Sequence, residues 1–186
     1  MKQDIVHSTL VLGGARSGKS SFAESLAEKY AKEYRLPVTY IATAEVTDSE
    51  MGNRIRRHRE ERPATWSTIE EPIEVANVLK NMKDPQVVLI DCLSLLLNNW
   101  LYYGEYSETA FLKRKDEFVS AIASAEWPII MVSNEVGFGL VPAEFESRVY
   151  RDWLGWLNQA VAQRASHVYL VVAGIPIDVR KWQASW

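Results

Sequence analysis

Short apolar runs recur along the chain, and longer segments with helical spacing separate them. Each run is bounded by turn-forming or charged residues, and its apolar residues are continuous rather than alternating. Continuous apolarity predicts strands covered on both faces, which is typical of a parallel sheet between helices. The predicted strands are Ser8–Gly13 (STLVLG), Val38–Thr43 (VTYIAT), Val87–Cys92 (VVLIDC), Pro128–Asn134 (PIIMVSN) and His167–Gly174 (HVYLVVAG).

The segments between these runs predict helices. Thr47 and Glu50 have the spacing of a capping box, and Pro63 follows the end of that segment, so a helix is expected there as well. The pattern as a whole predicts an α/β fold, with a mostly parallel sheet flanked by helices, in one domain over residues 1–186. The predicted helices are Lys19–Tyr34, Thr47–Glu61, Ile73–Asn81, Thr109–Ala125 and about Phe145–Ala165.

Composition narrows the class of protein. Hydrophobic residues make up 47% and charged residues 24% of the 186 residues, which excludes disordered and collagen-like chains. The net charge of −3 argues against a general nucleic-acid-binding surface, so any cationic site must be local. No apolar run is long enough to predict a membrane span or a signal peptide. The single cysteine, Cys92, lies in an apolar run, which favours a buried thiol without a catalytic role and a cytoplasmic protein.

A phosphate-binding loop follows the first predicted strand. The sequence GGARSGKS fits the pattern G-x-x-x-x-G-K-[ST] at a strand-to-helix junction. Backbone N–H groups of such a loop wrap phosphate oxygens, Lys19 reaches the β- and γ-phosphates, and Ser20 ligates magnesium. The alternative is a glycine-rich turn that only caps a helix. The predicted nucleotide-binding residues of the loop are Gly13, Gly14, Ala15, Arg16, Ser17, Gly18, Lys19 and Ser20.

Asp91 ends the third predicted strand, where a P-loop enzyme places the acid that holds magnesium. Helix capping is the alternative role for this residue. Gly13, Thr43 and Asn134 also stand at strand ends, and the carboxyl edge of an open α/β sheet is where ligands bind.

A cationic segment, RIRRHREERP, surrounds one histidine. On a helix Arg54, His58 and Arg62 share a face, because they are four residues apart. Nearby positive charge lowers the pKa of an imidazole and keeps it nucleophilic, and the same arginines can neutralise a polyphosphate. The residues alone leave three roles open: a solvated face, a phosphate clamp and a covalent nucleophile. His7 and His167 are expected to be structural.

Five segments together carry a family resemblance: GGARSGKSSFAE, YIATAEVTDSEMGNRIRRHREERPATW, LIDCLSLLLNN, SNEVGFGLVP and RDWLGWLNQAVAQRASHVYLVVAGIP. From about Thr9 to Val179 the chain resembles the bifunctional adenosylcobinamide kinases and adenosylcobinamide-phosphate guanylyltransferases of the cobalamin pathway. The resemblance implies a RecA-like P-loop fold and a homotrimer. It also implies ATP or GTP as phosphate donor, Mg²⁺, and transfer of GMP from GTP through a guanylyl-histidine to give adenosylcobinamide-GDP.

The resemblance assigns roles to individual residues. His58 matches the guanylylated histidine, and it is preceded by Arg57 where some members have a second histidine. Asn134 and Glu135 match an Asn-Glu pair that meets either the γ-phosphate or the corrinoid, unless it caps the loop. The segment Gly174 to Arg180 resembles a closing Gly-x-x-x-x-Lys pattern only if arginine replaces lysine and one extra residue is allowed between the two positions. The other nucleotide-contacting residues would be Thr43, Ala44, Glu45, Arg59, Glu60, Glu61, Arg62, Pro63, Glu70 and Asp91.

Two other functions compete with this one. A P-loop kinase for another small alcohol would use the loop and Asp91 and keep His58 as an electrostatic clamp. A nucleotide-dependent switch would use hydrolysis only to exchange a protein partner, but the sequence marks no partner surface.

Overall fold

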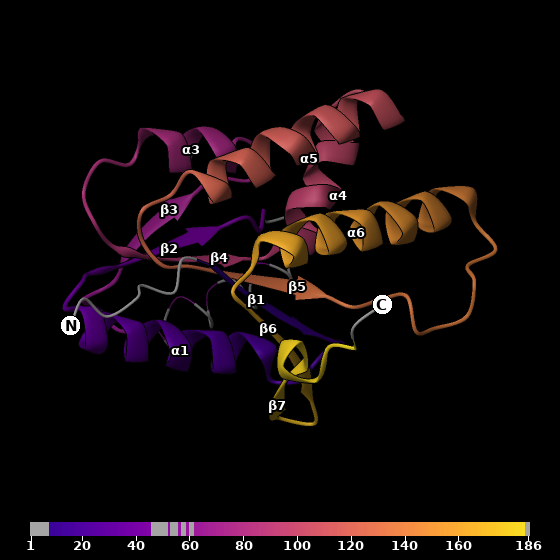
Figure 1. Ribbon diagram of the computed structural model, residues 1–186. Coiled ribbons are helices and arrows are strands. Elements are labelled where there is room, and N and C mark those ends of the chain that lie inside the picture. The colour runs from indigo at the N-terminus through magenta and orange to yellow at the C-terminus, as the bar shows by residue number, and fades with distance from the viewer. Residues whose placement is uncertain (1–7, 46–51, 53–55, 57–58, 60–61, 185–186) are drawn as a thin grey trace.

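A seven-stranded sheet forms the centre of the protein (Figure 1). The computed structural model describes residues 8–45, 52, 56, 59 and 62–184. Within these residues the strand order is β3-β2-β4-β5-β1-β6-β7; β1 to β6 run parallel, and β7 pairs antiparallel with β6. The strands are β1 (Ser8–Gly13), β2 (Val38–Ala42), β3 (Ser67–Glu70), β4 (Val87–Asp91), β5 (Ile129–Asn134), β6 (His167–Val172) and β7 (Ile175–Asp178).

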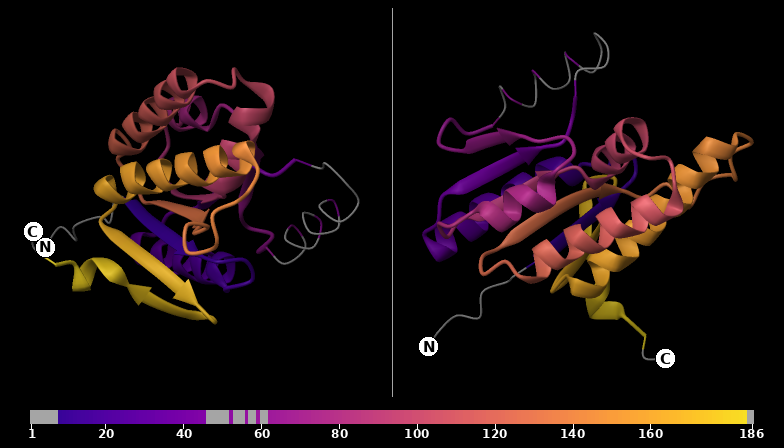
Figure 2. Two further views of the ribbon diagram at one scale, coloured as in Figure 1. Left: turned by 90° about the vertical axis from the view of Figure 1, so that its right-hand side faces the viewer. Right: turned by 90° about the horizontal axis from the view of Figure 1, so that it is seen from above.

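Helices cover both faces of the sheet. Helix α1 lies on one face, and α3, α4, α5 and α6 lie on the other (Figure 1). Figure 2 shows α5 and α6 side by side over the sheet. In the described part of the chain no helix is long and apolar enough to cross a membrane. The helices are α1 (Lys19–Tyr34), α3 (Val75–Asn81), α4 (Leu93–Tyr103), α5 (Glu108–Ala123), α6 (Phe145–Arg164) and the 3-10 helix η1 (Val179–Trp182).

The core is divided by the sheet into two apolar clusters. The larger cluster lies under α3 to α6 and includes Leu97, Phe118 and Leu154, which are fully buried. The smaller one lies under α1 and includes Ala23 and Ala27 of that helix and Val11 of β1. Strand residues therefore alternate between two buried faces, which explains why their apolar runs are continuous.

The predicted fold class is confirmed. The five predicted strands and four of the predicted helices are present, with ends that differ from the prediction by no more than two residues. The sequence analysis missed α4, β3, β7 and η1. The predicted helix over Thr47–Glu61 lies mostly outside the described residues, although Gly52, Arg56 and Arg59 are helical.

Substitution by alanine should lower the free energy of unfolding by very different amounts at two phenylalanines, because one is buried and the other exposed. Phe118 is fully buried, whereas Phe138 is 84% exposed. We expect Phe118→Ala to lower the free energy of unfolding by about 3–5 kcal/mol, because it leaves a cavity in the larger cluster. Phe138→Ala, the matched control, should change it by about 0.5 kcal/mol or less. Urea unfolding of both variants measures the difference, and equal losses would contradict this description of the core.

Candidate active site

The loop between β1 and α1 has the backbone of a phosphate-binding loop. Arg16 and Gly18 have positive φ angles of 56° and 92°, and the Ser17 N–H donates to the Gly14 carbonyl at 3.3 Å. Gly18 is the N-cap of α1, whose first N–H groups lie at the loop. Such unpaired N–H groups and the helix dipole favour an anion at this position.

Two close contacts fix the loop in place. The Lys19 ammonium group donates to the Gly14 carbonyl at 3.0 Å, and the residue is only 8% exposed. The Gly174 N–H, in the turn between β6 and β7, donates to the Ser17 carbonyl at 2.8 Å. A Cβ atom on Gly18 would lie 3.2 Å from the Gly174 Cα. Glycine is therefore needed at Gly18 for both the φ angle and the approach of this turn.

Asp91 ends β4 on the face of the sheet that α1 covers. Its Oδ2 accepts a hydrogen bond from the Tyr40 hydroxyl at 3.1 Å. Burial, and next the Asp91 carboxylate, raise the pKa of Tyr40, so the hydroxyl stays a donor at neutral pH. The Arg62 guanidinium stacks on the Tyr40 ring, 3.5 Å from the ring centroid. Two residues predicted to contact nucleotide, Arg62 and Asp91, thus meet through one tyrosine.

Thr43 is fully buried where β2 ends. Its hydroxyl donates to the Cys92 carbonyl and accepts from the Cys92 N–H, both at 2.8 Å. Its carbonyl accepts from the Asn99 amide of α4 at 2.8 Å. These contacts give Thr43 a positioning role at the sheet edge, and direct contact of its hydroxyl with nucleotide stays a prediction.

A cleft of about 1020 Å³ opens beside this edge. Four predicted nucleotide-binding residues line it: Ala44, Glu45, Arg59 and Glu70. Arg59 forms an ion pair with Glu70, and Tyr103 across the cleft bonds to the Glu45 carboxylate, which raises the pKa of Tyr103. The phosphate loop, which follows β1, and this cleft, which lies where β2 and β3 end, thus both lie at the carboxyl edge of the sheet.

The remaining predictions have mixed outcomes. His58, Glu60 and Glu61 lie outside the described residues, as do Arg54 and Arg57, so the role of His58 stays a prediction. Pro63 lies directly after this segment and its carbonyl accepts from the Trp66 N–H at 3.0 Å.

The Asn-Glu pair and Arg180 have contacts that the structure does describe. Glu135 bonds the Gly137 N–H at 2.7 Å, and the Glu135 N–H donates to the Gly13 carbonyl at 3.1 Å. The pair thus caps its own loop and touches the end of the phosphate-loop strand. Arg180 donates to the Ala162 carbonyl near the C-terminus of α6, where the helix dipole stabilises a positive charge.

Sequence reasoning missed several residues of the site. Tyr40 is one, because its contact with Asp91 joins two strands that lie far apart in sequence. Asn98, Asn99, Tyr102 and Tyr103 of α4 line the cleft as well. The Asn-Asn pair inside an otherwise apolar segment was the available signal, since a buried amide requires hydrogen-bond partners.

The donor set fits a magnesium ion bound together with a nucleotide. Ser20 and Asp91 offer a hydroxyl and a carboxylate, and the described residues contain no cluster of three or more acidic, histidine or cysteine ligands. Mg²⁺ is usually held by one or two carboxylates, with phosphate oxygens and water completing its shell. A cage of protein ligands is therefore not required here.

The fold and the loop define a P-loop protein, whose phosphate-binding loop lies at the carboxyl edge of the sheet, where open α/β sheets bind their ligands. The family model described as cobinamide kinase / cobinamide phosphate guanyltransferase matches residues 9–179. The chain belongs to this family, and its two activities are those of a kinase and a guanylyltransferase of adenosylcobalamin biosynthesis.

Relatives cover nearly the whole chain. The bifunctional adenosylcobalamin biosynthesis protein CobP of Pseudomonas aeruginosa is 43% identical over 92% of this chain and 96% of its own length. Its counterpart CobU of Escherichia coli is 35% identical over 92% of this chain and 98% of its own length. A solved structure from Pyrococcus horikoshii OT3 is 13% identical and covers 96% of this chain and 88% of its own, with a TM-score of 0.53, which shows a shared fold.

Two neighbouring glycines should differ in their tolerance of alanine. A Cβ atom on Gly13 would lie 2.4 Å from the Ser17 Oγ and 2.8 Å from the Val171 carbonyl oxygen, whereas one on Gly14 meets nothing within 4 Å. We expect Gly13→Ala to displace the loop and weaken ATP binding about tenfold or more. Gly14→Ala should keep the loop in place and lose less affinity than Gly13→Ala, because its Cβ atom meets no protein atom. Calorimetric titration with ATP tests this, and equal affinities would refute the described loop packing.

Cys92 should react slowly while the protein is folded. Burial, and next the Asp91 carboxylate, raise the pKa of this thiol to about 11. We expect its alkylation by iodoacetamide at pH 8 to be at least about tenfold slower than in urea, because little thiolate is present and access is blocked. Mass spectrometry gives the rates. Equal rates in both states would contradict the burial of this residue.

Proposed function

We propose that the protein transfers the γ-phosphoryl group of ATP or GTP to the hydroxyl of adenosylcobinamide. It then transfers GMP from GTP to the new phosphate, and adenosylcobinamide-GDP and pyrophosphate are the final products. One observation supports this most: the phosphate loop and the arginine-lined cleft open at the same edge of the sheet, and Arg62 and Asp91 are joined through Tyr40. Both nucleotide reactions can therefore use one edge.

In the kinase step the loop positions the triphosphate and the acceptor hydroxyl attacks the γ-phosphorus. The bond to the β-phosphate oxygen breaks, the nucleoside diphosphate leaves, and the hydroxyl proton passes to solvent. Lys19 and the loop N–H groups neutralise charge that grows on the transferred group. Ser20 and Asp91 would hold Mg²⁺, which supplies further charge neutralisation on the phosphates.

In the guanylyl step an imidazole nitrogen of His58 attacks the α-phosphorus of GTP, and pyrophosphate leaves. The phosphate of the acceptor then attacks the guanylyl-histidine, which forms the diphosphate and releases the histidine. Arg59 and Arg62 are suited to the phosphates of this step. The ion pair with Glu70 and the stacking on Tyr40 hold these arginines near the cleft before the nucleotide binds.

The family resemblance adds two features to the proposal. The first is GTP as the guanylyl donor, with Mg²⁺ bound alongside it. The second is a homotrimeric assembly. Light scattering of the purified protein measures that assembly directly.

Two substitutions should separate the two reactions. We expect His58→Ala to abolish labelling by GTP that carries ³²P on the α-phosphate, because alanine offers no nucleophile. The same variant should keep much of its kinase activity, which needs only the loop and Mg²⁺. Lys19→Ala should lower the kinase kcat by about 10²–10³-fold. Labelling is read on a denaturing gel, and an acid-labile, alkali-stable band identifies a phosphoramidate.

His58→Gln serves as a matched control, because it keeps a polar side chain of similar size without a nucleophilic nitrogen. Both His58 variants should retain the thermal stability and ATP affinity of the wild type. A His58→Ala protein that still forms the acid-labile label would place the nucleophile elsewhere. Equal loss of both activities would show that His58 organises a shared pocket instead.

A further inference from the structure

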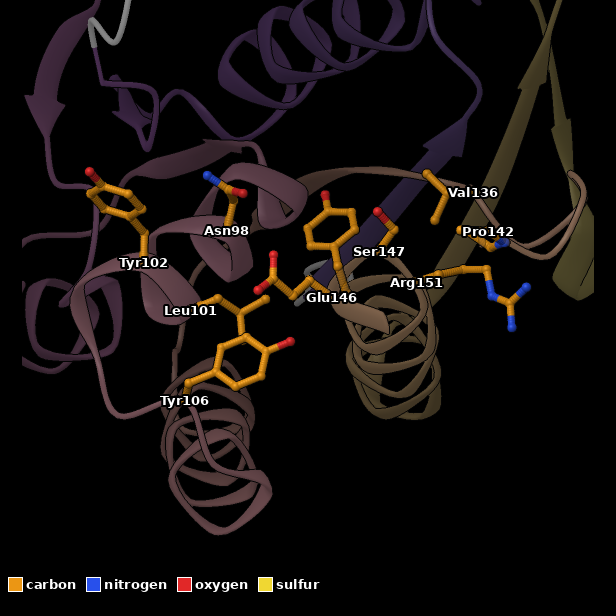
Figure 3. Close-up of a pocket in the computed structure, with 10 residues that line it drawn as sticks. Asn98, Leu101, Tyr102, Tyr106, Val136, Pro142, Glu146, Ser147 and Arg151 are labelled. Atoms are coloured by element: carbon orange, nitrogen blue, oxygen red, sulfur yellow. The ribbon is translucent and has the colours of Figure 1, made fainter. Parts of the chain in front are cut away.

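A second cavity, of about 670 Å³, lies next to the nucleotide cleft and is used by none of the steps above. Its walls come from α4, from the loop after β5 and from the first turns of α6 (Figure 3). The Tyr150 hydroxyl of α6 donates to the Ser94 carbonyl of α4 at 3.1 Å, so a hydrogen bond fixes the two helical walls against each other. Tyr106 packs on the buried Trp153, with ring centroids 5.9 Å apart. The cavity is therefore preformed.

This cavity adjoins the nucleotide cleft through α4. Asn98 and Tyr102 line both spaces, and they are four residues apart, on one face of the helix. Helix α4 is thus the ridge between the two cavities, with the arginines of the cleft on its far side.

The same cavity is also connected to the phosphate loop. Val136, which lines it, follows Glu135, whose N–H donates to the Gly13 carbonyl at 3.1 Å. The Asn158 amide of α6 donates to the Asn134 carbonyl at 3.1 Å and holds this strand end against the helix. A molecule in the cavity therefore lies beside both nucleotide-handling features.

The lining combines apolar surface and neutral hydrogen-bonding groups with one carboxylate, Glu146, which disfavours a polyphosphate. Leu101, Val136 and Pro142 supply apolar contact, and the tyrosine rings add to it. Asn98, Ser147 and the tyrosine hydroxyls can exchange hydrogen bonds with amide groups. The Arg151 guanidinium is already paired with Asp152 at 3.0 Å. A large ligand with a methyl-rich rim and carboxamide side chains matches this surface better than a second polyphosphate would.

The rim extends the apolar surface beyond the cavity. Phe138, Leu140, Val141 and Phe145 are 84%, 96%, 67% and 64% exposed, and all of them belong to the loop after β5 or to the start of α6. A corrinoid is wider than the cavity, so part of its ring would lie over this rim. Exposed apolar patches of this kind mark binding surfaces.

We propose that this second cavity binds the corrinoid acceptor, from which the alcohol arm reaches the phosphate loop past Glu135 for the first transfer and the nucleotide cleft over α4 for the second. The inference rests on the proposed function, because an acceptor that is first phosphorylated and then guanylylated must reach both nucleotide-handling features. Only a place that adjoins the loop and the cleft satisfies this requirement without release of the intermediate.

The proposal can be tested with a substitution that fills the cavity with a large side chain from an exposed position. Ser147 is exposed on α6, so Ser147→Trp places an indole in the cavity without disturbing the core. We expect the Kd for adenosylcobinamide, measured by equilibrium dialysis without nucleotide, to rise about tenfold or more. The KM for adenosylcobinamide should rise similarly in the kinase assay, while the KM for ATP should stay within about twofold of the wild type.

Two control variants bracket this result. Ser147→Ala keeps the cavity open, and Ser120→Trp places the same indole on an exposed position of α5 that lines none of the described cavities. Both should bind adenosylcobinamide within about twofold of the wild type. A wild-type Kd for Ser147→Trp would overturn the proposal. So would a change in the mass of the assembly, measured by light scattering, without a change in Kd, because the cavity would then face a second copy of the chain.

The outcome also separates this inference from the proposed function. Labelling of the wild type by GTP requires no corrinoid and tests the guanylyl step alone. If the wild type labels and binds adenosylcobinamide but Ser147→Trp binds it equally well, only the cavity assignment fails. If the wild type neither labels nor phosphorylates adenosylcobinamide, the proposed function itself fails.

Discussion

The hydroxyl group of Thr43 joins the ends of two parallel strands at the point where the chain leaves the sheet. It bonds both backbone groups of Cys92 at 2.8 Å, and the Thr43 carbonyl is held by Asn99 of α4 at 2.8 Å. A buried polar network of this kind is costly unless every member is paired, and these contacts pair it. Asp91 directly precedes Cys92, and Ala44, which lines the cleft, directly follows Thr43, so the positions of Asp91 and of this wall of the cleft depend on the network.

Parallel strands add a second constraint. All six parallel strands end at the same edge, so the residues that follow them gather there whatever their distance in sequence. This is why the sequence could place Gly13, Asp91 and Asn134 together. The contact between Tyr40 and Asp91 could not be foreseen in the same way, because it depends on the register of β2 and β4 and on which face each side chain occupies.

Physical reasons explain why α4, β3 and β7 were not predicted from the sequence. Helix α4 is buried on most of its circumference, so its sequence LSLLLNNWLYY lacks the polar positions that reveal helical spacing. Strands β3 and β7 are the two edge strands, and most of their residues are exposed. They therefore lack the continuous apolar runs that marked the central strands. By contrast, β1 and α1 were predicted residue for residue, because a buried strand and a phosphate loop are both local in sequence.

Most residues that line the second cavity could not be predicted from the sequence, partly because α4 was not predicted. Asn98, Leu101 and Tyr102 belong to that unpredicted helix, and Val136 and Glu146 come from segments more than thirty residues further along the chain. Three segments of the family resemblance do contain cavity residues: LIDCLSLLLNN contains Asn98, SNEVGFGLVP contains Val136 and Pro142, and RDWLGW begins with Arg151.

Electrostatics explains how the arginines can remain near the cleft and still be free to bind phosphate. In the Arg59–Glu70 ion pair, 61% of the arginine side chain and 58% of the glutamate side chain are exposed. Exposed pairs contribute only about 0–1 kcal/mol, so a phosphate group that replaces Glu70 loses little. Arg62 differs, because its guanidinium lies on the Tyr40 ring and is bound to a buried part of the site. One arginine is thus readily exchanged between partners and the other is fixed. In the proposed function this gives the two arginines different tasks: Arg59 would exchange Glu70 for a phosphate group, and Arg62 would stay in place on Tyr40.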